Sequence, residues 1–311
     1  MMFIVGFVQA DIGKRKYATN KNILLRGNIM KLLNGKKLAD KIKEEVKNEI
    51  TNTNLDVCLA VIQVGEDPAS STYVRNKEKA CEYCGINSKV YRLAENTGEA
   101  TLLGIIDLLN HDDTVNGILV QLPLPKHINE HIVIQAIAPE KDVDGFHEIN
   151  VGKLMIGEDT FVPCTTKGII ELLKENNIKI EGQNCVVVGR SNIVGKPTAI
   201  ELLHNNGTVT ICHSKTKGLK QICREADILV CAIGKPKFFN REYISPNTVV
   251  VDVGIHRQED GTLCGDVDFD DVKDIVSAIT PVPRGVGAMT ISMLMKNCLK
   301  AAKEQEIYND F

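Results

Sequence analysis

Apolar residues along the chain follow two spacings that together predict a mixed α/β fold. A helix face is marked by apolar residues at every fourth position: Leu38, Ile42, Val46 and Ile50. Continuous apolar runs at residues 57–64 and 117–122 have the length of buried strands. Between them, residues 71–84 predict a helix that ends before Gly85, because glycine commonly follows a helix C-terminus. Strands that alternate with helices indicate βαβ units and parallel sheets.

The second half of the chain predicts a larger sheet. Strands are expected at residues 185–188, 208–212, 227–232, 248–253 and 275–278. This number of strands is typical of a doubly wound, Rossmann-like nucleotide-binding fold. We place the domain boundary near residue 150 and assign 30–150 plus 285–311 to the first domain and 151–284 to the second. The last amphipathic segment, from about Gly287 to Lys303, predicts a helix that packs back on the first domain.

Residues 1–29 differ from the rest of the chain. An apolar stretch over residues 1–10 is followed by five basic residues, with Asp11 as the single acid. Two interpretations stay open: a targeting segment, or a start codon assigned too far upstream, with Met30 as the true first residue. We favour the second, and the missing small-residue cleavage site argues against secretion.

Composition excludes several function classes. The formal net charge of the 311 residues is −3, so bulk attraction to nucleic acid or to an anionic membrane is not expected. No apolar run approaches the roughly 20 residues of a membrane-spanning helix. The ten cysteines are scattered through apolar stretches and predict buried free thiols in a reducing compartment. Cys81 and Cys84 form a lone C-x-x-C with no second pair, so we expect no metal site.

A glycine-bearing turn follows the first strand of the second half. The strand at 185–188 runs directly into Gly189–Pro197, where backbone N–H groups at a helix N-terminus would stabilise a phosphate. The turn departs from G-x-G-x-x-G, because Ser191 stands at the second glycine position and the third glycine is displaced to Gly195. A plain strand-to-helix turn remains the alternative.

The residues after the next strand favour NADP over NAD. An NAD site usually places an acid there to bind the ribose hydroxyls, and this chain has none. Arg190, Ser214 and Lys215 can instead converge on a 2′-phosphate, although Lys215 alone would also fit a solvated loop. Gly234 and Gly254 close the following strands, where the nicotinamide half of a bound cofactor would lie.

A second group of polar residues is expected at the carboxyl ends of the strands of the first domain. Tyr73 and Lys77 are four residues apart and share one helix face. Gln121 ends a strand, and Asp142 and Asp144 lie in the following loop. Ligands of open parallel sheets bind beyond the carboxyl ends of strands, so these side chains are candidates for one cleft. Taken singly, each also fits a surface helix pair or a polar loop.

The complete set of motifs resembles a known family. Tyr-Val-x-x-Lys at Tyr73–Lys77, Val120–Pro125, Gly189–Pro197 and the late segment Pro281–Thr290 occur in one order. This is similar to the bifunctional methylenetetrahydrofolate dehydrogenase/methenyltetrahydrofolate cyclohydrolase family, over about residues 32–299. The resemblance implies a two-domain α/β fold with a folate cleft between a catalytic domain and an NADP domain. It also implies a cytoplasmic homodimer that oxidises methylenetetrahydrofolate, hydrolyses the methenyl product and serves one-carbon metabolism and purine biosynthesis.

Residue roles follow from the same resemblance. Lys77 is implied as the cyclohydrolase lysine, Gln121 as the residue that orients it, Tyr73 as the platform for the aminobenzoyl ring, and Asp144 as the partner of the pterin. The folate site would also be lined by Val120, Leu122, Pro283, Arg284, Gly285, Val286 and Gly287. NADP would be held by Gly189, Arg190, Ser191, Ser214 and Ile255.

Two departures from the family pattern concern the late segment. Arg284 replaces a glycine and Ala288 replaces a proline. Arg284 either reaches the glutamate tail of the substrate or crowds the pocket. Two rival functions also remain: an NAD-linked dehydrogenase without the hydrolytic step, and a non-catalytic dinucleotide-binding module. The presence of Lys77 argues against the dehydrogenase without hydrolysis. The non-catalytic module is disfavoured because it need not retain the full set of Tyr73, Lys77, Gln121 and Asp144.

Overall fold

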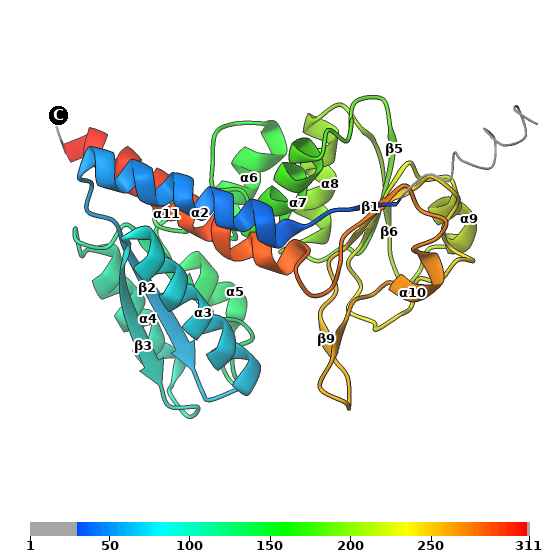
Figure 1. Ribbon diagram of the computed structural model, residues 1–311. Coiled ribbons are helices and arrows are strands. Elements are labelled where there is room, and N and C mark those ends of the chain that lie inside the picture. Colours follow the sequence, from blue (N-terminus) through cyan, green and yellow to red (C-terminus); the bar gives the residue numbers. More distant parts are fainter. Residues whose placement is uncertain (1–29, 310–311) are drawn as a thin grey trace, which may run out of the picture.

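The computed structural model describes residues 30–309 and confirms the two-domain α/β architecture (Figure 1). The two interpretations of residues 1–29 concern a segment outside the described residues. No helix within residues 30–309 is long and apolar enough to cross a membrane.

The first domain contains a three-stranded parallel sheet in the order β3-β2-β4. Its strands are β2 (Cys58–Val64), β3 (Asn87–Leu93) and β4 (Gly117–Val120). Its helices are α3 (Pro68–Cys84), α4 (Glu99–Asn110) and α5 (Glu130–Gln135). Strand β2 is buried along its whole length, as the continuous apolar run predicts. The carboxyl ends of β2 and β4 therefore present their following residues at one edge of the sheet.

The second domain contains a six-stranded parallel sheet in the order β1-β11-β8-β7-β5-β6. Its strands are β1 (Lys31–Leu32), β5 (Asn184–Val188), β6 (Thr208–Cys212), β7 (Ile228–Cys231), β8 (Val249–Asp252) and β11 (Ala278–Ile279). The short strands β9 (His256–Arg257) and β10 (Leu263–Cys264) form a separate hairpin. The helices are α6 (Glu148–Ile156), α7 (Cys164–Glu175), α8 (Gly195–His204), α9 (Leu219–Arg224) and α10 (Phe269–Val272). Strand β6 lies on one side of β5 and the next strand in sequence, β7, lies on the other. At this switch in strand order a crevice forms at the carboxyl ends of the strands, where such sheets bind nucleotides.

Two long helices run side by side across both domains (Figure 1). They are α2 (Gly35–Thr53) and α11 (Val286–Asn309), and α11 also packs against α3 and α7. The predicted apolar face of α2 is buried, which confirms the four-residue spacing. The packing of α11 on the first domain confirms the expected role of the last helix. Since α11 touches elements of both domains, it fixes their relative position.

The structure corrects the expected elements at four places. Strand β3 was not predicted, because its Asn-Ser-Lys start lacks an apolar run at a sheet edge. The strand expected at 275–278 is the two-residue β11 at Ala278–Ile279. Helix α3 begins earlier than expected, because the Asp67 carboxylate caps the Ser70 N–H and Pro68 occupies the first turn. Lys31–Leu32 was assigned to the first domain, but pairs with β11 of the larger sheet.

All ten cysteines are free and buried, as their apolar surroundings predict. Cys81 and Cys84 lie on α3 and face the core shared with α2 and α11. Burial raises the pKa of Cys81 to about 12 and that of Cys84 to about 11. Both thiols are therefore protonated at neutral pH and poor nucleophiles.

Candidate active site

Lys77 lies on α3 and points at the carboxyl edge of the first sheet. Its Nζ atom donates to Gln121 Oε1 at 3.0 Å. Gln121 follows β4, and its backbone N–H donates to the Ile62 carbonyl at 2.8 Å. Its side-chain Nε2 donates to the Leu122 carbonyl at 2.7 Å, so the amide oxygen is turned toward the lysine. The sheet thus holds an acceptor in place for this ammonium group.

Burial and charge act against each other at Lys77 and Asp144. Burial is the largest influence on Lys77 and lowers its pKa, while the Asp144 carboxylate raises it. Burial likewise raises the pKa of Asp144, and the charge of Lys77 opposes this shift. In both groups burial outweighs the attraction of the pair. The amine is therefore easier to deprotonate than an exposed lysine.

The neighbouring Asp142 braces the loop that carries Asp144. Its side chain is 1% exposed, and its carboxylate accepts from Gly145 N at 3.1 Å, His147 N at 2.7 Å and Asn150 Nδ2 at 2.9 Å. These three donors, at residues 145, 147 and 150, follow Asp142 closely in sequence, so its carboxylate stabilises the conformation of the loop. The carboxylate of Asp144, by contrast, interacts with the side chains of Lys77 and Cys164.

Cys164, the first residue of α7, lies directly behind Asp144. Its thiol donates to the Val143 carbonyl at 3.5 Å, and its nearness to the Asp144 carboxyl lowers the pKa of that group against the larger effect of burial. Asn297 of α11 donates to the same Val143 carbonyl at 2.8 Å. Cys164 was predicted only as one of ten buried thiols, although its position after Pro163 at a helix start could have marked it out. This contact joins the Asp loop to the second domain.

Tyr73 lies one helical turn before Lys77 on α3 and is 41% exposed. The two side chains share a helix face, as their spacing predicts. The half-exposed ring therefore offers a flat apolar surface on the helix face that carries the Lys77 amine. Val120 and Leu122, which flank Gln121, are buried and half-buried.

The late segment meets the expected cofactor site. A Cβ atom at Gly287 would lie 2.6 Å from Ile255 Cδ1, so these two residues are in close contact. Thr290, one turn further along α11, lies 3.1 Å from Thr165 through their hydroxyl oxygens. The loop before α11 packs on the start of α2, since Gly285 O lies 2.2 Å from an ideal Cβ at Gly35. Residues expected to line the folate site and the cofactor site are therefore adjacent.

Pro283 and Arg284 are exposed on this loop, and Gly285 and Val286 are buried beneath them. Arg284 has a φ of 81°, in the left-handed region that favours glycine. Its guanidinium has no ion-pair or hydrogen-bond partner within residues 30–309. A glycine, which the family pattern has at this position, adopts this φ without strain. Arg284 adopts it at a conformational cost because of its Cβ atom.

The turn after β5 has the geometry of a phosphate site. Gly189 has a φ of 144°, and a Cβ there would lie 2.3 Å from the Ala232 carbonyl oxygen. The Ser191 hydroxyl accepts from Val194 N and Gly195 N, both at 3.2 Å, and so caps the start of α8. The backbone N–H groups of residues 190–192 have no acceptor within the described part of the chain. Free amides at a helix start fit the pyrophosphate of a dinucleotide.

The side chains expected at a 2′-phosphate are exposed around this turn. Arg190, Ser214 and Lys215 all lie at the surface. The loop after β6 is closed by its own contacts, since Lys215 N donates to His213 Nδ1 at 3.1 Å and His213 N to Thr216 Oγ1 at 2.9 Å. The loop presents a hydroxyl and two cations and no carboxylate, which fits a phosphorylated ribose.

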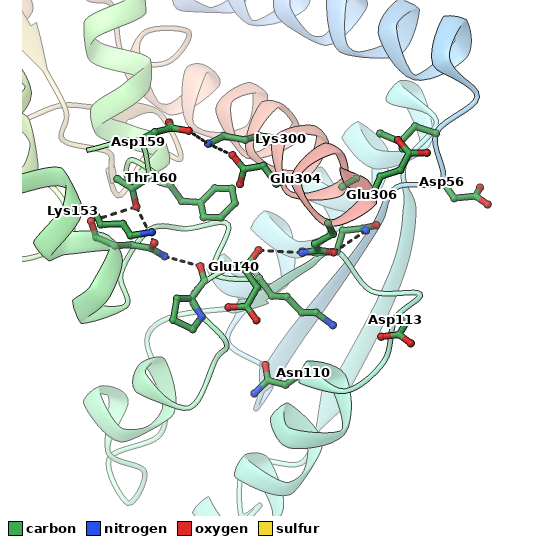
Figure 2. A pocket seen from close by; sticks show the side chains of 18 of the residues that line it. Asp56, Asn110, Asp113, Glu140, Lys153, Asp159, Thr160, Lys300, Glu304 and Glu306 are labelled. Atoms are coloured by element: carbon green, nitrogen blue, oxygen red, sulfur yellow. Dashed lines mark hydrogen bonds and ion pairs between the residues drawn. The ribbon is translucent and has the colours of Figure 1, made fainter. Parts of the chain in front are cut away.

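A large hollow of about 960 Å³ lies elsewhere (Figure 2). It is lined by residues that precede β2 and β4, including Asp56 and Asn116, and by the end of α11. Lys300 there is paired with Asp159 and Glu304, as Figure 2 shows. The hollow lies at the amino ends of the strands and contains none of the candidate active-site residues. Across residues 30–309 no group of three or more His, Cys, Asp or Glu side chains is arranged to bind a metal.

Comparisons with known proteins identify the family of the chain. Residues 33–144 match the model of the tetrahydrofolate dehydrogenase/cyclohydrolase catalytic domain, and residues 163–306 match the NAD(P)-binding domain of the same family. The bifunctional protein FolD of Agathobacter rectalis is 59% identical over 275 residues, which cover 88% of this chain and 99% of the relative.

Solved structures give the same result. The bifunctional FolD enzyme of Campylobacter jejuni has 50% identity and a TM-score of 0.86, over 88% of this chain and 99% of that one. The Trypanosoma brucei enzyme, solved with NADP and an inhibitor, has 36% identity and a TM-score of 0.85, over 88% of this chain and 98% of that one. The chain therefore belongs to the tetrahydrofolate dehydrogenase/cyclohydrolase family and contains both its catalytic and its NAD(P)-binding domain.

Proposed function

We propose that this enzyme oxidises 5,10-methylenetetrahydrofolate to 5,10-methenyltetrahydrofolate with NADP and hydrolyses that product to 10-formyltetrahydrofolate. The observation that carries the proposal is the partly buried Lys77 amine, held 3.0 Å from Gln121 Oε1 and facing the Asp144 carboxylate. Family membership supports the same pair of activities.

The oxidation needs two ligands held close together. Bound NADP would accept a hydride from the methylene carbon, and the protein contributes orientation. Contact between Gly287 and Ile255 brings the proposed folate-lining loop against the proposed nicotinamide loop. We assign Tyr73 to stacking on the aminobenzoyl ring and Asp144 to the donor edge of the pterin, since a carboxylate accepts from such an array.

The hydrolysis needs proton transfer, which we assign to Lys77. Water adds to the methenyl carbon and loses one proton. The hydroxyl so formed loses its second proton as the carbon–nitrogen bond breaks, the departing nitrogen gains a proton, and one proton is released overall. Burial lowers the pKa of this amine, so it gives up a proton more readily than an exposed lysine does. Gln121 would keep this amine aimed at the substrate through its own bond to Leu122.

We propose NADP rather than NAD as the dinucleotide. Arg190, Ser214 and Lys215 support a 2′-phosphate, and the loop after β6 has no acid to bind an unphosphorylated ribose. Gly189, Ser191 and Ile255 complete the proposed cofactor contacts. Parallel titrations with NADP and NAD test this preference: a lower KM for NAD would contradict it.

The decisive experiment separates the two activities. Absorbance of NADPH after mixing protein, methylenetetrahydrofolate and NADP reports the oxidation, and decay of methenyltetrahydrofolate reports the hydrolysis. The variant Lys77→Met is expected to keep measurable oxidation and lose hydrolysis, because it keeps the length of the side chain and removes the amine. Lys153→Met, on the exposed surface of α6, serves as the matched control. Equal loss of both activities in Lys77→Met would contradict the division of roles.

We further propose a cytoplasmic homodimer and a domain boundary near residue 150, with Lys31–Leu32 moved to the second domain because they pair with β11. The ten free cysteines support a reducing compartment, and family membership supports dimerisation. Sedimentation equilibrium checks the dimer, and fractionation of cells checks the location. Limited proteolysis between residues 144 and 163, the gap between the two family-model matches, checks the boundary.

A further inference from the structure

Two buried carboxylates lie beneath the carboxyl ends of β7 and β8. Asp266 is 0% exposed and Asp252 is 3% exposed. Asp252 ends β8, and Asp266 follows the β9–β10 hairpin. Buried carboxylates are retained only where several donors satisfy them. Their donors show what the pair holds together.

Asp266 binds three consecutive backbone amides after β7. Its Oδ2 accepts from Ile233 N at 2.6 Å and Gly234 N at 3.0 Å, and its Oδ1 accepts from Lys235 N at 2.8 Å. The same Oδ1 lies 2.8 Å from Nε2 of His256, which follows Ile255. One carboxylate therefore interacts with both the loop after β7 and the loop after β8.

Asp252 in turn fixes the backbone of Asp266. Its Oδ1 accepts from Asp266 N at 2.9 Å and from Gly254 N at 3.0 Å, and its Oδ2 accepts from Val267 N at 3.0 Å. The fit is tight, because a Cβ at Gly254 would lie 2.4 Å from Asp266 Oδ1. The position of Asp266 is thus set by β8 itself.

From these contacts we propose that Asp266 is a positioning residue for the oxidation step, acting through the loops Ile233–Lys235 and Gly254–Ile255. This inference rests on the proposed function, which places the nicotinamide half of NADP at these two loops. The carboxylate does not reach the cofactor; it fixes the backbone that does. Lys77 and Gln121 lie in the other domain, so the hydrolysis should not depend on Asp266.

The test replaces Asp266 by asparagine, which keeps the shape and removes acceptors. An amide NH₂ at the Oδ2 position faces the backbone N–H groups of Ile233 and Gly234, and at the Oδ1 position it faces that of Lys235, so at least one backbone donor loses its acceptor. We expect the KM for NADP to rise about tenfold, equal to about 1.4 kcal/mol or one hydrogen bond to a charged group. The rate of methenyltetrahydrofolate hydrolysis, measured without dinucleotide, should stay within about twofold of wild type.

Two further variants keep the test decisive. His256→Leu removes one contact of Asp266 and leaves the three backbone amides bound. We therefore expect a smaller rise in the KM for NADP, with the rate of hydrolysis unchanged. This variant also tests the inference if Asp266→Asn does not fold. Asp271→Asn is the matched control, because Asp271 accepts from Arg241 N at 2.7 Å in the same domain, outside both loops. Its two activities should match wild type.

The outcomes separate this inference from the proposed function. A wild-type protein without oxidation activity contradicts the function itself. A wild type with both activities, whose folded Asp266→Asn and His256→Leu variants keep the wild-type KM for NADP, overturns the inference. Proportional loss of both activities in these variants also overturns it, because that pattern reports general destabilisation.

Discussion

Arg284→Gly is predicted to stabilise the protein, although it deletes a long side chain. Arg284 has a φ of 81° on the loop before α11. A residue with a Cβ pays about 1–2 kcal/mol in the left-handed region, and glycine does not. The exposed guanidinium has no partner within residues 30–309, so its removal costs no described contact.

The expected gain is smaller than the strain. Glycine makes the unfolded chain more flexible, which costs about 0.5–1 kcal/mol. The net increase in the free energy of unfolding is therefore about 0.5–1 kcal/mol, or roughly 1–2 °C in Tm for a chain of this size. Thermal unfolding followed by circular dichroism, at a fixed scan rate, measures the shift.

The control is Arg224→Gly at the end of α9, where the backbone is helical and glycine should cost about 1 kcal/mol. The two substitutions remove the same side chain and add the same glycine, so only the backbone conformation differs. A fall in Tm for Arg284→Gly that equals the fall for Arg224→Gly would refute the strain argument.

Two further predictions concern the cofactor turn and the pH dependence of hydrolysis. Gly189→Ala places a Cβ 2.3 Å from the Ala232 carbonyl oxygen, which must move by more than 0.5 Å. We expect the affinity for NADPH, measured by the change in NADPH fluorescence on binding, to fall at least about tenfold, with hydrolysis spared. Asp144→Asn removes the charge that raises the pKa of Lys77, so that pKa falls further. If the free amine acts as base, the acidic limb of the kcat profile for methenyl hydrolysis then moves to lower pH; a limb that stays fixed would contradict this role of Lys77.

Apolar periodicity predicted the elements whose burial decides their conformation. β2 is buried along its length, and the α2 face with Ile42 and Val46 is buried too. Strand β3 escaped prediction because half of its residues face solvent at a sheet edge, where polar side chains carry no strand signal. β1 escaped because two residues pair with a strand about 250 positions later, which no local pattern encodes.

The candidate site also contains residues that the sequence predicted and residues that it did not. Lys77 and Gln121 were predicted from their places on a helix and at a strand end, and the structure brings their side chains to 3.0 Å. Cys164 and Asp266 were not predicted, because each acts on backbone or carboxylate groups far away in the sequence. A thiol near apolar residues and an acid after a hairpin carry no sequence signal of such a role, because their hydrogen-bond partners are known only from the fold.

The distribution of these groups between the domains argues that the two activities respond differently to domain movement. The amine and its acceptor, Lys77 and Gln121, lie in one domain and stay together however the second domain moves. In the proposed reaction, by contrast, the hydride would cross from a folate bound at the first domain to a nicotinamide bound at the second. Its path therefore depends on the contacts that join them: Asn297 on the Val143 carbonyl, and Gly287 against Ile255. Both contacts are made by α11, so the last helix sets the donor–acceptor distance for oxidation while hydrolysis is set within the first domain.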